Sequence, residues 1–299
     1  MIHSNSVSVR SRPAARRPKG QGAGAAAGWS GPLRLALHGL IAALALTAGL
    51  ASTAARASGC LPIARAPLGV VPAAFEPAAL PAEGSVRLTF LGHSSFLIES
   101  PGGATVVTDY NGYIRAPETP AVVTMNNAHS THYTDTVEPG VEHVLRGWDP
   151  EGGMAEHDLV YRDMRVRNVP TDVRDWGGTR ANGNSIFVFE VADLCVAHLG
   201  HLHHLLRDVD LAELGVIDVL LVPVDGSYTM AQDLMLQVIE QIGPAVVIPM
   251  HYFGAHTLAR FLDMIRGRGR YEVVMSDTPT VTLSRATLPF GKVLVLPGG

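Results

Sequence analysis

Cysteine is scarce in this sequence, and its scarcity excludes one kind of metal chemistry. The 299 residues include two cysteines, Cys60 and Cys195, and neither belongs to a C-x-x-C pair. A zinc site built from thiolates is therefore not expected. The two cysteines could form one disulfide in an oxidising compartment. Cys195, however, lies inside the apolar run "LCVAHLG", a position that favours a small buried hydrophobic side chain.

Charged residues are also few, and acidic ones are missing altogether from the beginning of the chain. Residues 1–57 carry seven Lys or Arg and no Asp or Glu, while the rest of the chain carries 16 basic against 27 acidic residues, a balance of −11. Non-specific binding to nucleic acid needs clustered Lys and Arg on the folded domain. This balance therefore argues against a nucleic-acid partner.

The basic start leads into an apolar stretch that indicates export. Residues 33–52 read "LRLALHGLIAALALTAGLAS", and "ARA" follows at 55–57. This order is typical of a secretory signal peptide, so we expect an exported protein in a bacterial periplasm. An uncleaved anchor facing the periplasm is the alternative, because roughly 20 apolar residues nearly suffice to span a bilayer. "ASGC", ending at Cys60, also loosely resembles a lipobox, which would tether the protein by lipid.

The rest of the chain divides into a lead-in and one domain. Residues 58–84 are rich in Pro and Ala and predict an extended segment. Residues 85–299 begin with short β-like runs such as "VRLTFLG", "SFLIES" and "AVVTM", and "NSIFVFEV" with "LCVAHLG" predicts a hairpin. Strand-like and helix-like segments then alternate to the end of the chain. This order predicts a single α/β domain in which helices cover sheets.

Histidines gather where the strand-like runs end. Eight of the 13 histidines lie at four such places: His93, His129, His132, His198, His201, His203, His204 and His251. Polar residues just past strand ends are where α/β proteins build their sites. One histidine in such a place is usually a solvated or hydrogen-bonded residue. Four matching places favour a metal site, because imidazole is the commonest metal ligand.

The stretch "NNAHSTHYTD", residues 126–135, holds the densest part of this pattern. Asn127, His129 and Thr131 alternate, so they would share one side of an extended segment, whereas His132 needs a turn to join them. An H-x-x-H pair alone predicts little. Together with the other histidines at strand ends, it favours a metal-binding turn.

The order of the motifs resembles that of the metallo-β-lactamase superfamily, and within it the branch that includes ascorbate-6-phosphate lactonase. The resemblance rests on "LTFLGHSSFLIES", "VVTMNNAHSTHYTD", "HLGHLHH" and "VVIPMHYFG", and it covers about residues 86–267. It implies an αββα four-layer sandwich with one or two Zn²⁺ at one edge. It also implies that metal-bound hydroxide attacks an ester, lactone, amide or phosphodiester.

The family turn H-x-H-x-D-H is degenerate in this chain. Residues 127–132 read N-x-H-x-T-H, so His129 and His132 match the family pattern, while Asn127 and Thr131 replace a histidine and an aspartate. Near the family's later loop histidine stands Val173, with Asp172 and Asp175 beside it. These replacements remove ligands from both metal positions of the family.

Two further positions compensate for part of the loss. His201 stands where the family has a bridging aspartate, and His251 matches the last family histidine. We therefore predict one metal ion held by His132, His201 and His251, with His129 as a fourth ligand. Zn²⁺ is the expected ion, and Mn²⁺ and Fe²⁺ are the alternatives. His203 could take the place of His201 as a ligand.

Carboxylates near these positions are the candidates for the remaining roles. Asp109 matches a common family aspartate and is expected to orient a ligand histidine, and Asp172 or Asp175 is expected to enter the site from the loop; Asp109 and Asp175 are predicted as catalytic residues. Asp225 is a weaker candidate, and each of the four could instead cap a turn. "GHSSF" is not a G-x-S-x-G elbow, so a serine nucleophile is not expected.

The predicted protein is an exported metal-dependent hydrolase of a small ester, lactone or phosphoester. The alternative is a non-catalytic descendant of the same fold that binds a metal or a ligand. The expected partner is a small-molecule substrate, with membrane contact only through the N-terminal segment or a lipid anchor. Segments 110–120 and 136–183 carry no motif and are expected to be variable loops that shape the substrate site.

Overall fold

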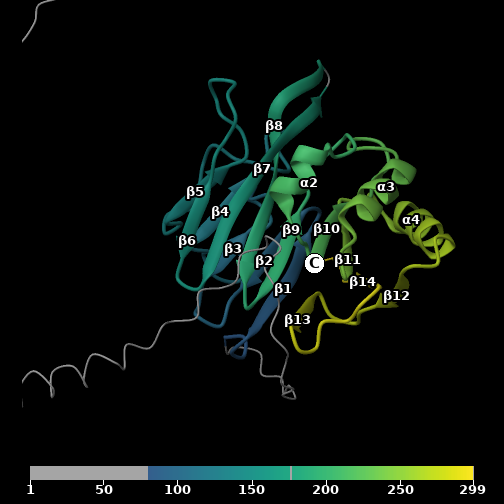
Figure 1. Cartoon of the computed structure of the whole chain (residues 1–299). Coiled ribbons are helices and arrows are strands. Elements are labelled where there is room, and N and C mark those ends of the chain that lie inside the picture. The colour runs from purple at the N-terminus through teal and green to yellow at the C-terminus, as the bar shows by residue number, and fades with distance from the viewer. Residues whose placement is uncertain (1–79, 176, 299) are drawn as a thin grey trace, which may run out of the picture. The chain divides into compact units, whose positions relative to one another are not determined.

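The computed structural model describes residues 80–175 and 177–298 (Figure 1). The expected signal or anchor segment, and the lead-in up to residue 79, lie outside the described residues. None of the helices in the described ranges is long and apolar enough to cross a membrane.

Two sheets form the framework. The first has six strands in the order β13 (Thr280–Ser284), β1 (Ser85–Gly92), β2 (Ser95–Glu99), β3 (Thr105–Val107), β4 (Val122–Met125) and β5 (His143–Arg146). The second has eight, in the order β12 (Glu272–Met275), β14 (Lys292–Val295), β11 (Val246–Met250), β10 (Val219–Pro223), β9 (Leu194–His198), β8 (Gly178–Val191), β7 (Met164–Asp175) and β6 (Asp158–Tyr161). The predicted hairpin is confirmed, because β8 and β9 pair antiparallel.

Alternation of side chains explains how the sheets pack. In β1, Val86, Leu88 and Phe90 are buried, while the intervening Arg87 forms an ion pair with Glu99 on the neighbouring strand. Successive side chains of a strand point to opposite faces, so one face of β1 can be apolar throughout. These apolar residues join buried side chains of the second sheet in one core cluster between the sheets.

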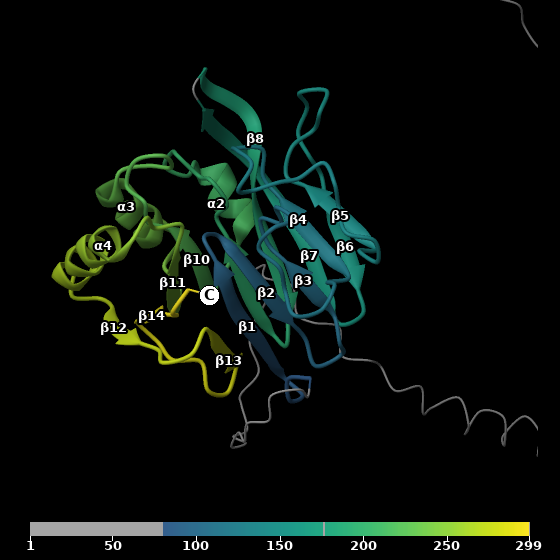
Figure 2. The same cartoon turned by 180° about the vertical axis from the view of Figure 1, so that it is seen from behind.

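Helices cover the outer face of the eight-stranded sheet. They are α2 (Asp208–Leu214), α3 (Gln232–Ile242) and α4 (Ala255–Gly267). The helix α3 buries Met235, Leu236 and Ile239, positions that share one side of a helix, and it ends at Gly243 in the left-handed conformation. These side chains pack with those of α4 against the sheet, and α3 and α4 lie beside β10 and β11 in both views (Figure 1, Figure 2).

The outer face of the six-stranded sheet is covered differently. Leu97, Val107 and Met125 on that face pack against Tyr133 and Trp148, which come from the segment that follows β4 and from the one that follows β5. The expected fold was an αββα four-layer sandwich, and its two-sheet α/β core is confirmed. Within the described residues the α-helices lie on the eight-stranded sheet, and the segments after β4 and β5 cover the other sheet.

The middle of the chain contains more sheet than the sequence suggested. Segment 136–183 was expected to be variable loop, but it holds β5, β6, β7 and the beginning of β8. In β7 the buried residues Met164 and Val166 alternate with Arg165 and Arg167, which bind Glu190 on β8. These charged positions interrupt the apolar pattern of the strand. Met164 and Val166 lie in the core between the sheets, while Val169 lies in the cluster that the helices cover.

Cys195 agrees with both possibilities stated for it. Its side chain is buried in β9, as expected for a small hydrophobic residue, and it is disulfide-bonded. The only other cysteine in the sequence, Cys60, lies outside the described residues.

Strand direction brings the polar strand ends to one edge of the sandwich. Strands β9, β10 and β11 run parallel to one another, as do β3 and β4. The carboxyl ends of parallel strands meet at the same edge of a sheet, where α/β proteins place their sites. The segments that follow these five strands supply the candidate site.

Candidate metal centre

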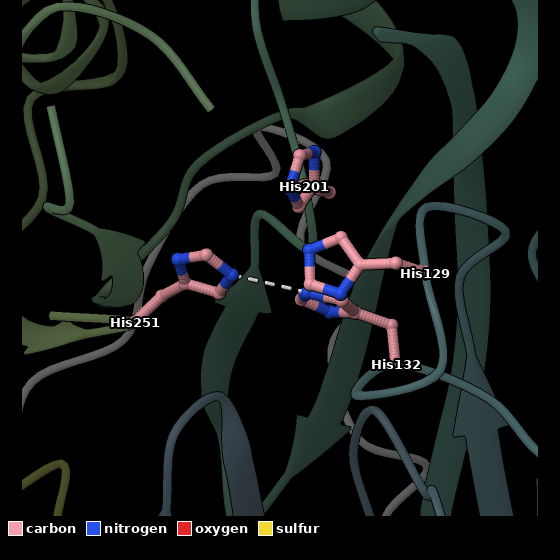
Figure 3. A group of neighbouring side chains, drawn as sticks. All are labelled: His129, His132, His201 and His251. Carbon is pink, nitrogen blue, oxygen red and sulfur yellow. Dashed lines mark hydrogen bonds between the residues drawn. The ribbon is translucent and has the colours of Figure 1, made fainter. Parts of the chain in front are cut away.

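Four histidines from three separate segments converge at this edge (Figure 3). His129 and His132 follow β4, His201 follows β9 and His251 follows β11. One ring nitrogen from each lies within 4.8 Å of the others. His129 is half-buried and the other three are buried. These are the four residues that the sequence pattern indicated.

The imidazole of His132 is oriented by a buried carboxylate. Its Nδ1 lies 2.6 Å from Oδ2 of Asp109, and both side chains are fully buried. Oδ1 of Asp109 accepts a second hydrogen bond, 3.0 Å long, from the side-chain amide of Asn126. A carboxylate at Nδ1 favours the tautomer with its proton there, which leaves the lone pair of Nε2 directed at the other histidines.

Charge and burial keep this pair as carboxylate and neutral imidazole. Burial alone would raise the pKa of Asp109, but His132 and His198, with hydrogen bonds from His132 and Asn126, hold that pKa well below its usual range. Burial lowers the pKa of His132, against the opposing effect of Asp109. Neutral imidazole is the form that binds metal.

His251 is arranged in a similar way, with a looser contact. Its Nδ1 lies 3.3 Å from Oδ1 of Asp225, an ion-pair distance without the geometry of a hydrogen bond. Asp225 is itself fixed, because its Oδ2 accepts hydrogen bonds from the backbone of Ser227, Tyr228 and Thr229. These contacts hold the pKa of Asp225 below its usual range despite burial, which acts to raise it, and His251 is the main cause of the lowering.

The Nε2 atoms of His132 and His251 lie 3.1 Å apart. If the Nδ1 proton of each ring faces its carboxylate, both Nε2 atoms carry lone pairs, and two lone pairs this close repel unless a proton or a cation lies between them. Two nitrogen ligands at zinc–nitrogen distances of roughly 2.0–2.1 Å would be about 3.3 Å apart in tetrahedral geometry. The observed separation fits two ligands of one ion.

His201 and His129 carry the other unsatisfied nitrogens. Both ring nitrogens of His201 and Nε2 of His129 are buried without a hydrogen-bond partner among the described residues. Burial, reinforced by the neighbouring histidines, lowers the pKa of His201 to about 2 and that of His129 to about 4. Buried polar atoms in native proteins are almost always paired, so these atoms point to a ligand. The donor set of four imidazoles fits Zn²⁺ or a similar divalent ion.

Thr131 stands where the family turn has an aspartate, and its hydroxyl contacts two histidines. Its Oγ1 lies 2.7 Å from Nδ1 of His129 and 3.0 Å from Nε2 of His93. The hydroxyl therefore links His93 to the cluster and fixes the ring of His129, whose Nε2 stays available. His93 had been singled out by its place at a strand end, and its ring centroid lies 4.2 Å from that of His251.

Two asparagines position the ligand segments, and no sequence pattern pointed to them. Asn126 joins Asp109 to the second sheet, since its Oδ1 accepts a 2.8 Å hydrogen bond from the backbone of Ser185. Asn184 accepts a 2.7 Å hydrogen bond from the backbone of His201. Both pack against Gly200, where a Cβ atom would lie 2.4 Å from Nδ2 of Asn126 and 2.5 Å from Oδ1 of Asn184. Gly200 also has φ of +58°.

Backbone strain is concentrated at the same place. Seven non-glycine residues in the described ranges have positive φ, and three of them are His93, Asp109 and His251. The backbone N–H of His251 donates a 2.6 Å hydrogen bond to the carbonyl of His93, which ties two of these strained turns together. Strained residues persist where the surrounding structure fixes them, and they are frequent at functional sites.

Other candidate histidines lie outside the cluster. His198 is buried in β9, where its Nε2 donates to the carbonyl of Ser94 and its Nδ1 accepts from Gly200, so both nitrogens are used in packing. Nδ1 of His203 lies 3.1 Å from the carbonyl of Asp172. His203 therefore does not replace His201 in the cluster of the described structure.

Of the predicted loop carboxylates, Asp172 lies outside the cluster. Asp172 accepts a 3.1 Å hydrogen bond from the backbone of Asn182, which is a turn contact, and Val173 is fully buried. Asp175 is the last residue of β7 and pairs with Gly178 in the hairpin. Its catalytic role stays a prediction. Asp225, which ranked as a weaker candidate, is the carboxylate nearest to His251.

Comparison with known proteins agrees with a metal site at these histidines. The family model described as the beta-lactamase superfamily domain matches residues 87–251. A UPF0173 metal-dependent hydrolase of Pyrococcus horikoshii is 26% identical over 197 residues, which cover 56% of this chain and 84% of that protein. A protein of the same name from Salinibacter ruber is 28% identical over 198 residues, covering 55% and 84%.

Solved structures show the same fold. A Thermotoga maritima protein, named as a proposed Zn-dependent hydrolase of the metallo-β-lactamase superfamily, matches with a TM-score of 0.53 and 26% identity, covering 71% of this chain and all of that one. The metallo hydrolase Igni18 of Ignicoccus hospitalis matches with a TM-score of 0.51 and 21% identity, covering 67% and 99%. The second likeness bears on the fold alone.

Proposed function

The chain belongs to the metallo-β-lactamase superfamily and is a metal-dependent hydrolase, and from this premise we propose that it cleaves a small ester, lactone or phosphoester with one Zn²⁺. The proposed ligands are His129, His132, His201 and His251. One observation carries the proposal: four imidazoles converge within 4.8 Å, and four of their buried nitrogens have no hydrogen-bond partner among the described residues.

A divalent ion in such a site lowers the pKa of a bound water and polarises a carbonyl or phosphoryl oxygen. The residues around the proposed ligands orient the ligand rings. Asp109 holds the ring of His132 and Asp225 lies against that of His251, so each ring presents Nε2 to the shared centre. Thr131 fixes His129 through Nδ1, so His129, the most exposed of the four, also presents Nε2 to the shared centre.

The replacements in the family turn support one ion rather than two. Asn127 and Val173 stand near two ligand positions of the first family metal, and Val173 is buried in the β7–β8 hairpin. The four histidines form the single group of potential ligands found in the described residues. Imidazole suits Zn²⁺ and also Fe²⁺, whereas Mn²⁺ prefers oxygen ligands, so zinc or iron is favoured over manganese.

Metal analysis combined with hydrolysis assays tests this function. The purified full chain is loaded separately with Zn²⁺, Fe²⁺ and Mn²⁺, and activity is measured on ester, lactone and phosphodiester substrates. His132→Ala and His251→Ala should lose both the metal and the activity. His256→Ala, which changes an exposed histidine of α4, is the matched control and should lose neither.

The outcomes separate the two candidate functions. Bound metal with hydrolysis abolished in both variants supports the proposal. Bound metal with no hydrolysis of any substrate class would favour the non-catalytic alternative, which the loss of the family carboxylate at Thr131 makes reasonable. Activity that survives both substitutions would exclude these histidines from the reaction.

We further propose export to the periplasm. The basic and apolar start of the chain supports it, and so does the disulfide at Cys195, because stable disulfides form in oxidising compartments. Expression of the full chain in a bacterium, followed by mass spectrometry of the periplasmic protein, should give an N-terminus close to residue 58. A cytoplasmic protein that keeps residues 1–57 would refute export, and a membrane-bound one would favour the anchor.

A further inference from the structure

Two large aromatic side chains stand exposed beside the histidine cluster. Tyr228 and Phe253 are 52% and 55% exposed, and their ring centroids lie 5.4 Å apart in an edge-to-face arrangement. The ring of Phe253 is 5.5 Å from that of His251, and the ring of Tyr228 is 6.4 Å from that of His129. The pair therefore contacts two of the proposed ligands, on the side of the site formed by the ends of β10 and β11.

Both rings are carried by fixed segments. The backbone N–H of Tyr228 donates to Asp225, and the guanidinium of Arg174 donates to the carbonyls of Ser227 and Thr229 on either side of it. Phe253 follows His251 by two residues, in the segment that the His93 carbonyl ties down. Rigid aromatic side chains lose little conformational entropy on binding a ligand, which suits them to recognition.

Whether an exposed aromatic side chain indicates a binding site depends on what lies next to it. Single exposed apolar residues are common on protein surfaces and need no explanation, and Phe290, 76% exposed between β13 and β14, is an example. Tyr228 and Phe253 differ because they are paired and adjoin a group of unsatisfied polar atoms. Apolar and aromatic walls around a few polar groups are the usual composition of small-molecule sites.

We propose that Tyr228 and Phe253 bind a flat apolar group of the substrate and thereby place the scissile bond beside the four histidines. The substrate class is an ester or lactone that carries an aromatic or similarly planar group near the carbonyl. This inference rests on the proposed hydrolytic function and adds the determinant of its specificity.

Matched substrate pairs test the inference without a change of leaving group. The zinc-loaded full chain is assayed with ethyl 3-phenylpropanoate against ethyl propanoate, and kcat/KM is compared. We expect the aromatic ester to be preferred by ~10-fold or more, the scale of one well-placed aromatic contact. In Tyr228→Ser, Phe253→Ser and the double variant the ratio of the two kcat/KM values should fall towards one. A ratio cancels any general loss of activity.

Binding gives a second readout that does not need turnover. Calorimetric titration of the zinc-loaded protein with 3-phenylpropanoate and with propanoate should show tighter binding of the first, and Phe253→Ser should remove the difference. Tyr228→Phe and Phe253→Tyr keep a ring and should keep the preference, and Phe290→Ser should leave it unchanged.

The results distinguish this inference from the proposed function. Hydrolysis of both esters at equal kcat/KM, with equal binding of both carboxylates, would overturn the aromatic site and leave the hydrolase intact. An aromatic preference that survives the double variant would also overturn it. Absence of hydrolysis together with selective binding of 3-phenylpropanoate would support the aromatic site and refute the hydrolase.

Discussion

Replacing Asp109 by Asn is the sharpest perturbation of the site, because it removes one charge and keeps the shape. Asp109 has φ of 45°, a left-handed conformation that Asn also tolerates. Its two oxygens accept hydrogen bonds from Nδ1 of His132 and from the amide of Asn126. The new side chain has one oxygen and one NH₂ group. The NH₂ group must therefore face one of the two donors, Nδ1 of His132 or the amide of Asn126, and that hydrogen bond is lost.

The size of the effect follows from these contacts. A buried donor without a partner costs about 1–3 kcal/mol of stability. The loss of a carboxylate behind a ligand histidine weakens metal binding by roughly 10- to 100-fold, or about 1.4–2.8 kcal/mol. Asp109→Asn is therefore expected to weaken zinc binding by that factor, as measured by competition with a chromogenic chelator at pH 7.5.

Asp218→Asn is the matched control. Asp218 is also a buried carboxylate, but it accepts from the backbone of Cys195 and pairs with Arg285, contacts that do not involve the cluster. Its replacement should lower stability in urea and leave zinc affinity within about threefold, since distant sites act independently. If Asp109→Asn binds zinc as tightly as the unchanged protein, the orientation of His132 by Asp109 does not matter and the reasoning is wrong.

Other consequences can be measured on the same protein. Asp225→Asn should weaken zinc binding by less than Asp109→Asn, because its 3.3 Å contact with His251 lacks hydrogen-bond geometry; an equal or larger loss in chelator competition would contradict this. Gly200→Ala should lower stability by about 1–3 kcal/mol in urea and weaken zinc binding, because a Cβ atom meets two site asparagines at a positive φ; wild-type values would show that the segment adapts. The pKa values of His129 and His201 in the folded protein, about 4 and about 2, lie below the ordinary histidine value of about 6.5, so unfolding takes up protons below pH 6.5. The free energy of unfolding of chelator-treated protein should therefore be greatest above pH 6.5 and fall as the pH drops towards 4, by up to about 1.4 kcal/mol per pH unit for His201; pH-independent stability over this range would refute the burial of neutral rings.

The position of the histidines could be predicted because strand ends are visible in sequence. Runs such as "AVVTM" and "AVVIPM" are apolar and β-branched, and the polar residue that follows each must lie at the sheet edge. His251 was located in this way, whereas His132, seven residues after "AVVTM", was assigned from the resemblance to the family turn. Whether their nitrogens converge depends on pairing between β10 and β11 and on the approach of β4 from the other sheet, which no local pattern contains.

The supporting contacts could not be predicted, because each joins residues far apart in sequence. Asn126 and Ser185 come from different sheets, and their hydrogen bond exists only after the sandwich has formed. Asp225 resembles a turn-capping residue, and it does cap the turn at 227–229. Its contact with His251 therefore left no separate sign in the sequence. Strand β7 was missed because its outward face carries arginines.

The number of metal ions bound per chain tests the central claim most directly. The full chain, purified, loaded with Zn²⁺ and freed of excess ion by gel filtration, is measured by mass spectrometry of its metal content. The site of His129, His132, His201 and His251 predicts a ratio of about one zinc ion per chain. A ratio near two would mean that a second ion is held by groups outside this cluster, and a ratio near zero would mean that the four histidines do not form a metal site.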